Sequence, residues 1–182
     1  PQILERAGLA TSESLFNSIA IGGVNLVFTL VGLYLLDRIG RKKLLLIGSY
    51  GYIISLAMVA YSFYAGVEPQ FLMTFLLLFI AAHAIGQGAV IWVFISEIFP
   101  NDVRALGQSF GASVHWICAA IITLITPVFI DKSNGIFKNP WPVFAFFAVM
   151  MVLQLLWVSR SVPETKEVSL EELEKELVRQ TS

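Results

Sequence analysis

The amino-acid sequence predicts an all-α membrane protein built around five transmembrane helices. Of its 182 residues, 57% are hydrophobic and 14% charged, and the mean hydropathy is +0.76, far from the averages of soluble domains. The chain also contains five stretches of 21 to 28 residues without Asp, Glu, Lys or Arg. A helix crosses the hydrocarbon core in about 20 residues, and only helices or closed barrels satisfy their backbone hydrogen bonds there. Each stretch is therefore long enough to span a membrane.

The five spans follow one another with short connections. We expect them at about residues 14–36, 44–66, 70–96, 106–130 and 141–160. Their apolar residues do not alternate with the two-residue period of barrel strands, and glycine and proline occur as membrane helices tolerate them. Residues 1–162 are thus expected to form one transmembrane bundle in the lipid bilayer. Five glycines are expected to permit close helix packing: Gly22, Gly23, Gly32, Gly48 and Gly51.

Residues 163–182 differ in composition and are expected to form a cytoplasmic tail. They contain a pair with capping-box spacing and a row of leucines on one helical face: Ser169 with Glu172, and Leu170, Leu173 and Leu177. A short amphipathic helix against the end of the bundle is one interpretation, and a frayed charged tail is the other.

Basic residues are distributed unevenly between the two sides of the predicted bundle. Nine of the 12 Lys and Arg residues lie between spans one and two, between spans three and four, or after span five. The other three, Arg6, Lys132 and Lys138, lie on the opposite side. Because Lys and Arg are retained on the cytoplasmic side, we expect a multi-pass protein of the cell membrane with a cytoplasmic C-terminus.

Several other classes of protein are disfavoured. The net charge is −1, and the basic residues are confined to short inter-helix segments, so nucleic-acid binding is not expected. The single cysteine, Cys118, lies within the fourth span and is interpreted as a packing residue, with no metal site or cofactor. His83, His115 and Glu97 lie on different spans or at different depths, and no HExxH motif, nucleophile elbow or phosphate loop joins them, so an enzyme is not expected.

Two cytoplasmic turns combine acidic and basic residues. The first is expected to be a tight basic loop: Asp37, Arg38, Ile39, Gly40, Arg41, Lys42 and Lys43. Basic residues alone would only mark the cytoplasmic side of the membrane. They do not account for the acidic residue Asp37 at the start of the turn. Glu97 and Arg104 bracket Pro100 after span three in a similar way. Ion pairs between such charges, and their hydrogen bonds to helix-end carbonyls, would hold neighbouring helices together on the cytoplasmic face.

These segments resemble the sugar porter family of the major facilitator superfamily. The resemblance rests on three motifs in the family's order: Asp37-Arg38-Ile39-Gly40-Arg41-Lys42, Ser96-Glu97-Ile98-Phe99-Pro100 with Arg104, and Pro163-Glu164-Thr165-Lys166. In the family these motifs follow helices eight, ten and twelve. The resemblance covers nearly the whole chain and implies a cytoplasmic gate formed by Asp37, Arg38, Gly40, Arg41, Glu97, Arg104 and Glu164.

The resemblance also implies which part of a transporter this chain represents. It corresponds to helices eight to twelve of the C-terminal six-helix bundle of a major facilitator fold. The chain begins at Pro1, and five spans are one fewer than a six-span repeat, so we expect a helix and an N-terminal six-helix bundle upstream. Two departures concern the third span, where Gln87 and Ala89 stand in place of prolines found in many members. Glu167 also replaces a glycine usual in the family.

Polar and aromatic residues within the spans are the candidate binding residues, because such residues usually face a bundle interior or an aqueous cavity. Asn25 either hydrogen-bonds a neighbouring helix or, as the resemblance implies, reaches a sugar. Trp92 offers a flat apolar face and one N–H donor, and the family implies a tryptophan beneath the sugar at this position. His115 and Trp116 match a pair that is Asn or Gln followed by Trp in relatives. A neutral imidazole donates and accepts as an amide does, and it also permits a proton-linked role. His83 is interpreted as a packed residue.

The resulting hypothesis is a secondary transporter that moves a monosaccharide by alternating access, with protons as a second candidate substrate. Two alternatives remain open. One is a transporter of another small solute, such as a polyol or organic acid, although these helices contain no embedded Arg or Lys to bind an anion. The other is a non-transporting sensor that keeps the transporter fold.

Overall fold

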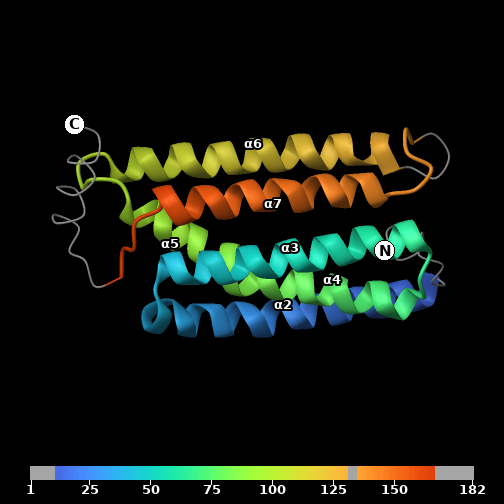
Figure 1. Cartoon of the computed structure of the whole chain (residues 1–182). Helices are drawn as coiled ribbons and strands as arrows, with labels where there is room; N and C mark the ends of the chain where they lie inside the picture. Colours follow the sequence, from blue (N-terminus) through green and yellow to red (C-terminus); the bar gives the residue numbers. More distant parts are fainter. Residues whose placement is uncertain (1–10, 131–134, 167–182) are drawn as a thin grey trace.

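The computed structural model describes residues 11–130 and 135–166. Within these residues the chain forms long helices arranged side by side, and no strand (Figure 1). The elements are α2 (Thr11–Ile39), α3 (Arg41–Ala65), α4 (Pro69–His83), the π-helix η1 (Ala84–Gly88), α5 (Ala89–Glu97), α6 (Arg104–Ile130) and α7 (Trp141–Ser161). Since α4, η1 and α5 run on without a break, five helical rods are long and apolar enough to cross a membrane. The predicted all-α class with five such helices is confirmed. The tail after Lys166, with its expected amphipathic helix, lies outside the described residues.

The first two rods meet at a single residue. α2 continues to Ile39 and α3 begins at Arg41, so the chain turns tightly at the glycine of the expected basic turn, but the turn is shorter than residues 37–43. Gly40 alone reverses the chain, at a φ of 98°, in the region that glycine adopts readily. The charged residues extend the helices instead of ending them, because beyond the hydrocarbon core a helix can continue in water. An ion pair between Asp37 and Arg41 bridges the turn.

At its centre the continuous third rod changes from α-helix to the π-helix η1, which the sequence did not predict. Glycines pack this π-helix closely against its neighbours. A Cβ atom on Gly86 would lie 2.7 Å from the Cα of Gly48, and one on Gly32 would lie 2.9 Å from the carbonyl oxygen of Ala84. Small residues of this kind let helix backbones approach within a membrane, where no hydrophobic effect drives helices together.

The other expected packing glycines differ. Gly51 lies against Ala82 of α4, as predicted, whereas a Cβ atom on Gly22 or Gly23 would meet no atom of a neighbouring helix within 4 Å. Only the half of α2 that faces η1 therefore uses glycine for close packing.

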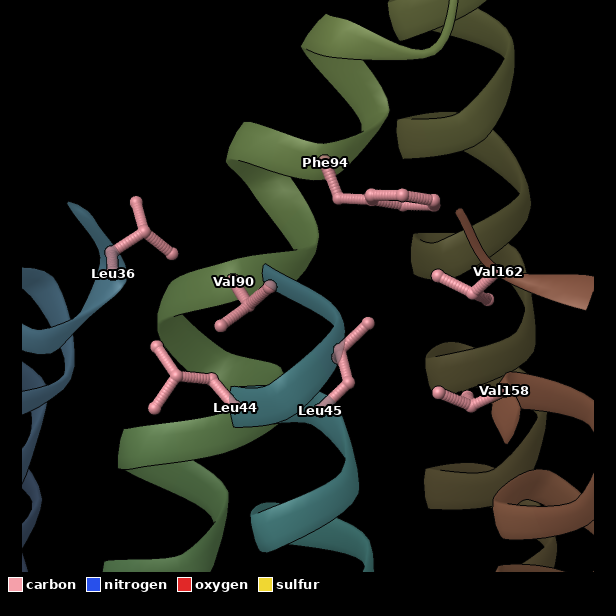
Figure 2. Packing of buried hydrophobic residues seen from close by; sticks show 7 residues of the cluster. All are labelled: Leu36, Leu44, Leu45, Val90, Phe94, Val158 and Val162. Carbon is pink, nitrogen blue, oxygen red and sulfur yellow. The ribbon is translucent and has the colours of Figure 1, made fainter. Parts of the chain in front are cut away.

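The best-packed part of the bundle lies at the end where α2 meets α3. α3 contacts α2, α4, η1 and α7 and so occupies the centre of the group. Seven buried apolar residues from α2, α3, α5 and the end of α7 join there (Figure 2): Leu36, Leu44, Leu45, Val90, Phe94, Val158 and Val162. This cluster fixes the helix ends that carry the charged residues.

The helix α6 is attached mainly through α5. Gly107 lies beneath the ring of Phe99, and Gly111 lies against Ile95. Gly107 is the buried residue of α6, and Cys118, expected to pack, is exposed. Between α6 and α7 an apolar groove of about 730 Å³ is lined by residues that include Ile122, Phe129, Phe146 and Met150.

Candidate functional site

A charged cluster closes the end of the bundle around Arg41. The Arg41 guanidinium binds Glu97 of α5 in a two-pronged contact, with Nη2 to Oε1 at 2.8 Å and Nε to Oε2 at 3.1 Å. It also donates to Asp37 Oδ1 at 3.2 Å and to the Leu36 carbonyl at 3.3 Å. The Arg41 and Glu97 side chains are only 12% and 20% exposed, whereas Asp37 is 81% exposed. The pair with Glu97 is thus the strongest link in the cluster.

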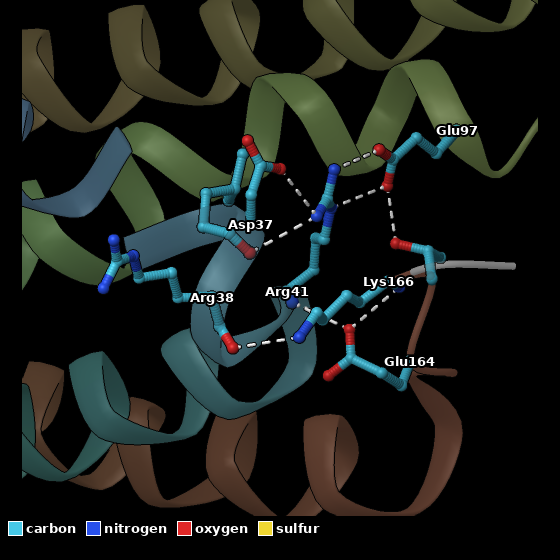
Figure 3. Close-up of polar contacts among 8 residues, drawn as sticks. Asp37, Arg38, Arg41, Glu97, Glu164 and Lys166 are labelled. Carbon is cyan, nitrogen blue, oxygen red and sulfur yellow. Dashed lines mark hydrogen bonds and ion pairs between the residues drawn. The ribbon is translucent and has the colours of Figure 1, made fainter. Parts of the chain in front are cut away.

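The segment after α7 joins the same cluster (Figure 3). Glu164 Oε1 accepts the backbone N–H of Arg41 at 2.8 Å, so a carboxylate 123 residues away caps the N-terminus of α3. Thr165 donates its hydroxyl to Glu97 Oε2 at 2.5 Å. Lys166 Nζ donates to the Arg38 carbonyl at 3.0 Å. Four segments of the chain therefore meet: the ends of α2 and α5, the start of α3, and residues 164–166.

Gly40 makes this meeting possible. A Cβ atom at this position would lie 2.5 Å from Glu164 Oε2 and 2.7 Å from its carboxyl carbon. The missing side chain is therefore what allows Glu164 to reach the first N–H of α3.

Two of the expected gate residues lie differently. The guanidinium of Arg38 stacks 4.3 Å above the ring of Tyr34, and only the Arg38 carbonyl joins the charged cluster. Arg104 donates through Nε to the Phe99 carbonyl at 3.4 Å. Its Nη2 is buried and finds no hydrogen-bond partner within residues 11–130 and 135–166. Arg104 thus holds the turn after α5 and does not join the charged cluster.

A second group, which we term the ring cluster, consists of Trp92 of α5 with His115 and Trp116 of α6. The Trp92 and His115 rings meet edge to face at 5.1 Å. The two indoles lie 6.4 Å apart at an interplanar angle of 28°, and His115 meets Trp116 edge to face at 5.4 Å. Trp92 and Trp116 are 41% and 64% exposed, so their faces are open to a ligand. The cluster offers flat apolar surfaces beside an imidazole that can donate and accept.

Asn25 is exposed on α2. In the part of the chain that the structure describes, no hydrogen bond joins it to the ring cluster. Its predicted role in binding a sugar stays a prediction.

Sequence reasoning did not predict the polar contacts that Thr165, Lys166 and His83 make. Thr165 and Lys166 belong to the charged cluster, and their place in the Pro163–Lys166 motif was the signal for them. His83, interpreted as packed, is exposed and shares a hydrogen bond with Tyr52 of α3. The two residues are 31 positions apart on different helices, and no motif connects them.

The described residues contain no group of three His, Cys, Asp or Glu side chains able to hold a metal ion. A helical bundle of membrane-spanning length, with ion pairs at one end and polar and aromatic residues within the spans, has features found in membrane transport proteins.

Comparison with known proteins identifies the family. Residues 1–177 match the family "Sugar (and other) transporter", and the chain belongs to it. The chain is thus a multi-pass membrane protein of a family of transporters.

Its relatives include sugar symporters. The chain is 35% identical to the arabinose-proton symporter of Bacillus subtilis (strain 168), over 96% of this chain and 37% of that protein. It is 31% identical to the D-xylose-proton symporter of Escherichia coli (strain K12), over 96% and 36%. Among solved structures, a double tryptophan mutant of the xylose transporter XylE matches with a TM-score of 0.88 at 30% identity, covering 96% of this chain and 37% of that one. The chain spans somewhat more than a third of the length of these relatives.

Proposed function

We propose that this chain is the C-terminal transmembrane part of a secondary transporter that moves a monosaccharide by alternating access. The observation that carries the proposal is the ring cluster, because two exposed indoles that are nearly parallel suit a sugar ring with apolar faces. The relatives' names, arabinose-proton and D-xylose-proton symporter, support a sugar substrate and a proton-coupled mechanism. In this proposal Trp92 and Trp116 stack on the sugar, and His115 and Asn25 bind its hydroxyl groups.

The charged cluster is the cytoplasmic gate in this mechanism. Exposed ion pairs contribute only about 0–1 kcal/mol each, but Arg41 and Glu97 are largely shielded from solvent. Several such links together can hold one of two states that differ by a few kcal/mol. Substrate binding then needs only to shift that balance for the cluster to separate and the cytoplasmic side to open.

Placement as helices eight to twelve is part of the proposal. It is supported by the order of the three motifs, and the alignments, which cover 36–37% of the relatives, support only that the chain matches a part of a longer transporter. The apolar groove between α6 and α7 is a surface that a further helix of the same bundle would cover. The remaining wall of the substrate cavity would come from an N-terminal six-helix bundle. The excess of basic residues at the charged end supports a cytoplasmic C-terminus, and location in the cell membrane is part of the same proposal.

The test is uptake of radiolabelled hexoses and pentoses by vesicles containing the full-length parent protein. We expect saturable uptake that falls in Trp92→Ala and His115→Ala. Trp157→Ala is the matched control, because Trp157 is a 60% exposed indole on α7, outside the ring cluster. Uptake that is indifferent to Trp92 and His115 would reject the binding site. Absence of uptake for every sugar would favour a polyol or organic-acid carrier, or a sensor.

A further inference from the structure

Gln87 of η1 is a polar side chain that joins the third rod to α3. Its Nε2 donates to the Ser49 hydroxyl oxygen at 3.2 Å. Ser49 is 0% exposed, and its hydroxyl donates in turn to the Leu45 carbonyl at 2.7 Å. The serine oxygen thus accepts one hydrogen bond and donates another, as a hydroxyl group can. Two hydrogen bonds in series therefore link the centre of the third rod to the backbone of α3.

The amide of Gln87 lies where the third rod and α3 approach closely. A Cβ atom on Gly48 would lie 2.6 Å from Gln87 Oε1 and 2.8 Å from the Cα of Gly86. Glycine at position 48 therefore leaves the space that the amide occupies. Small residues bring helix backbones together by van der Waals packing, which restricts rotation less than a directional hydrogen bond does. The hydrogen bond to Ser49 thus fixes how the third rod is rotated relative to α3.

Packing alone does not account for a glutamine at this position. Gln87 Oε1 is buried and accepts no hydrogen bond from residues 11–130 and 135–166. A buried acceptor without a donor is costly, and a leucine would fill a similar space without that cost. Polar groups kept within a membrane span are candidates for function. In several proteins a buried polar group selects one arrangement of neighbouring helices at a cost in stability.

The rotation of the third rod at η1 decides where Trp92 points. Gln87 and Trp92 are five residues apart on the same continuous rod, about 7.5 Å along its axis. Side chains reach about 5–6 Å from a helix axis, so a rotation of about 10° moves the indole by about 1 Å. Binding groups need to be held to within about 0.5 Å and 10–20°. The 5.1 Å separation of the Trp92 and His115 rings therefore depends on this rotation.

Apolar packing restrains the Trp92 ring less than it restrains its neighbours. Val90 and Phe94 are 0% and 7% exposed and belong to the buried apolar cluster. Trp92 lies two residues from each, turned by about 200° around the axis, and is 41% exposed. Its orientation therefore depends more on how the rod is rotated than on contacts of the ring itself.

We propose that Gln87 is a positioning residue for the ring cluster, an inference that rests on the proposed function. Its hydrogen bond to Ser49 fixes the rotation of α5, so that Trp92 meets the edge of His115 and keeps an indole face toward the sugar. Gln87 does not touch the sugar, and no proton or covalent bond moves. Without the hydrogen bond the rod samples several rotations. The fraction in the binding arrangement then falls, which weakens the apparent affinity by the same factor.

The experiment measures sugar uptake and thermal unfolding of the full-length parent protein. Gln87→Leu and Ser49→Ala each remove the hydrogen bond. We expect each to raise the KM for uptake about three- to tenfold, the factor that one hydrogen bond commonly contributes, with a nearly unchanged maximal rate. The unfolding midpoint of Gln87→Leu should stay equal or rise, because leucine removes the unpaired acceptor. The double variant should have the KM of the single variants, because both substitutions remove the same bond.

Two variants serve as matched controls. Ser55→Ala removes an equally buried hydroxyl group of α3, which donates within its own helix to the Gly51 carbonyl at 2.7 Å. Gln154→Leu makes the glutamine substitution on α7, outside η1 and the ring cluster. Neither control should change the KM.

The outcomes separate this proposal from the proposed function. KM values of Gln87→Leu and Ser49→Ala equal to those of the controls would overturn the positioning role. A higher KM of Gln87→Leu together with a lower unfolding midpoint would also overturn it, as would effects that add in the double variant. If Gln87→Leu does not fold, Ser49→Ala, which removes a single oxygen atom, decides by comparison with Ser55→Ala. Absence of uptake in the wild type for every sugar would reject the proposed function itself.

Discussion

Replacing Arg41 with lysine tests whether the charged cluster holds the end of the bundle closed. Lysine keeps the positive charge but cannot make the two-pronged contact with Glu97 that arginine makes at 2.8 and 3.1 Å. The backbone N–H of residue 41, which binds Glu164, is unaffected by the substitution. The variant therefore isolates the guanidinium group.

The free energy lost in Arg41→Lys follows from the exposure of the two acidic partners, Glu97 and Asp37. Hydrogen bonds to charged groups contribute roughly 1.5–3 kcal/mol, and the 81% exposed Asp37 adds little. Since Glu97 is 20% exposed and lysine keeps one contact, the loss should be about 2 kcal/mol. A factor of ten corresponds to 1.4 kcal/mol, so the population with this end open should rise about 30-fold.

A cysteine at Val162 reports this opening. Val162 is 3% exposed within the apolar cluster beneath the charges. In a Cys118→Ser background of the full-length parent, the rate at which Val162→Cys reacts with a maleimide should follow the open population. Arg41→Lys should raise that rate about 30-fold by the estimate above. Lys43→Gln, the exposed neighbouring cation, is the control, and equal rates in the two variants would refute the reasoning.

Two further substitutions test the packing that positions the sites. Gly40→Ala should destabilise the protein by roughly 1–3 kcal/mol, because alanine is strained at a φ of 98° and its Cβ would displace Glu164; a thermal unfolding midpoint in detergent equal to that of the wild type would contradict this. Gly86→Leu should abolish folded expression, because Gly86 lies against the backbone of Gly48, whereas Gly22→Leu, where nothing lies within 4 Å, should be tolerated. Fluorescence-detected size-exclusion chromatography compares the two variants, and similar profiles would show that η1 does not need this close contact.

The features that depend on composition over long windows could be predicted from the sequence. The number of helices follows from the charge-free stretches, since a span needs about 20 apolar residues whatever its neighbours are. The ends were less predictable, because Asp37 and Arg38 extend α2 where a charged pair was expected to begin a loop. A charge marks the edge of the hydrocarbon core, and the helix itself ends where the backbone turns at Gly40.

The π-helix and the Tyr52–His83 contact could not be predicted in this way. Gln87 and Ala89 replaced the family's prolines and left no residue that marks a helix break, and η1 depends instead on glycines from three helices that meet in space. His83 lies in an apolar stretch. In such a stretch the sequence pattern does not distinguish positions that face lipid from positions that face a cavity. Only the placement of α3 beside α4 distinguishes a packed histidine from one held by a tyrosine.

The two polar clusters are linked by the short helix α5. It carries Trp92 in the ring cluster and Glu97 in the charged cluster, five residues apart, which is about 7.5 Å along a helix axis. Because η1 separates α5 from α4, a change in the π-helix would move α5 as a rigid unit and shift both residues together. A ligand that repositions Trp92 would then strain the contact between Glu97 and Arg41. In the proposed transporter, the π-helix would thus allow a ligand at the ring cluster to affect the charged cluster at the end of the bundle.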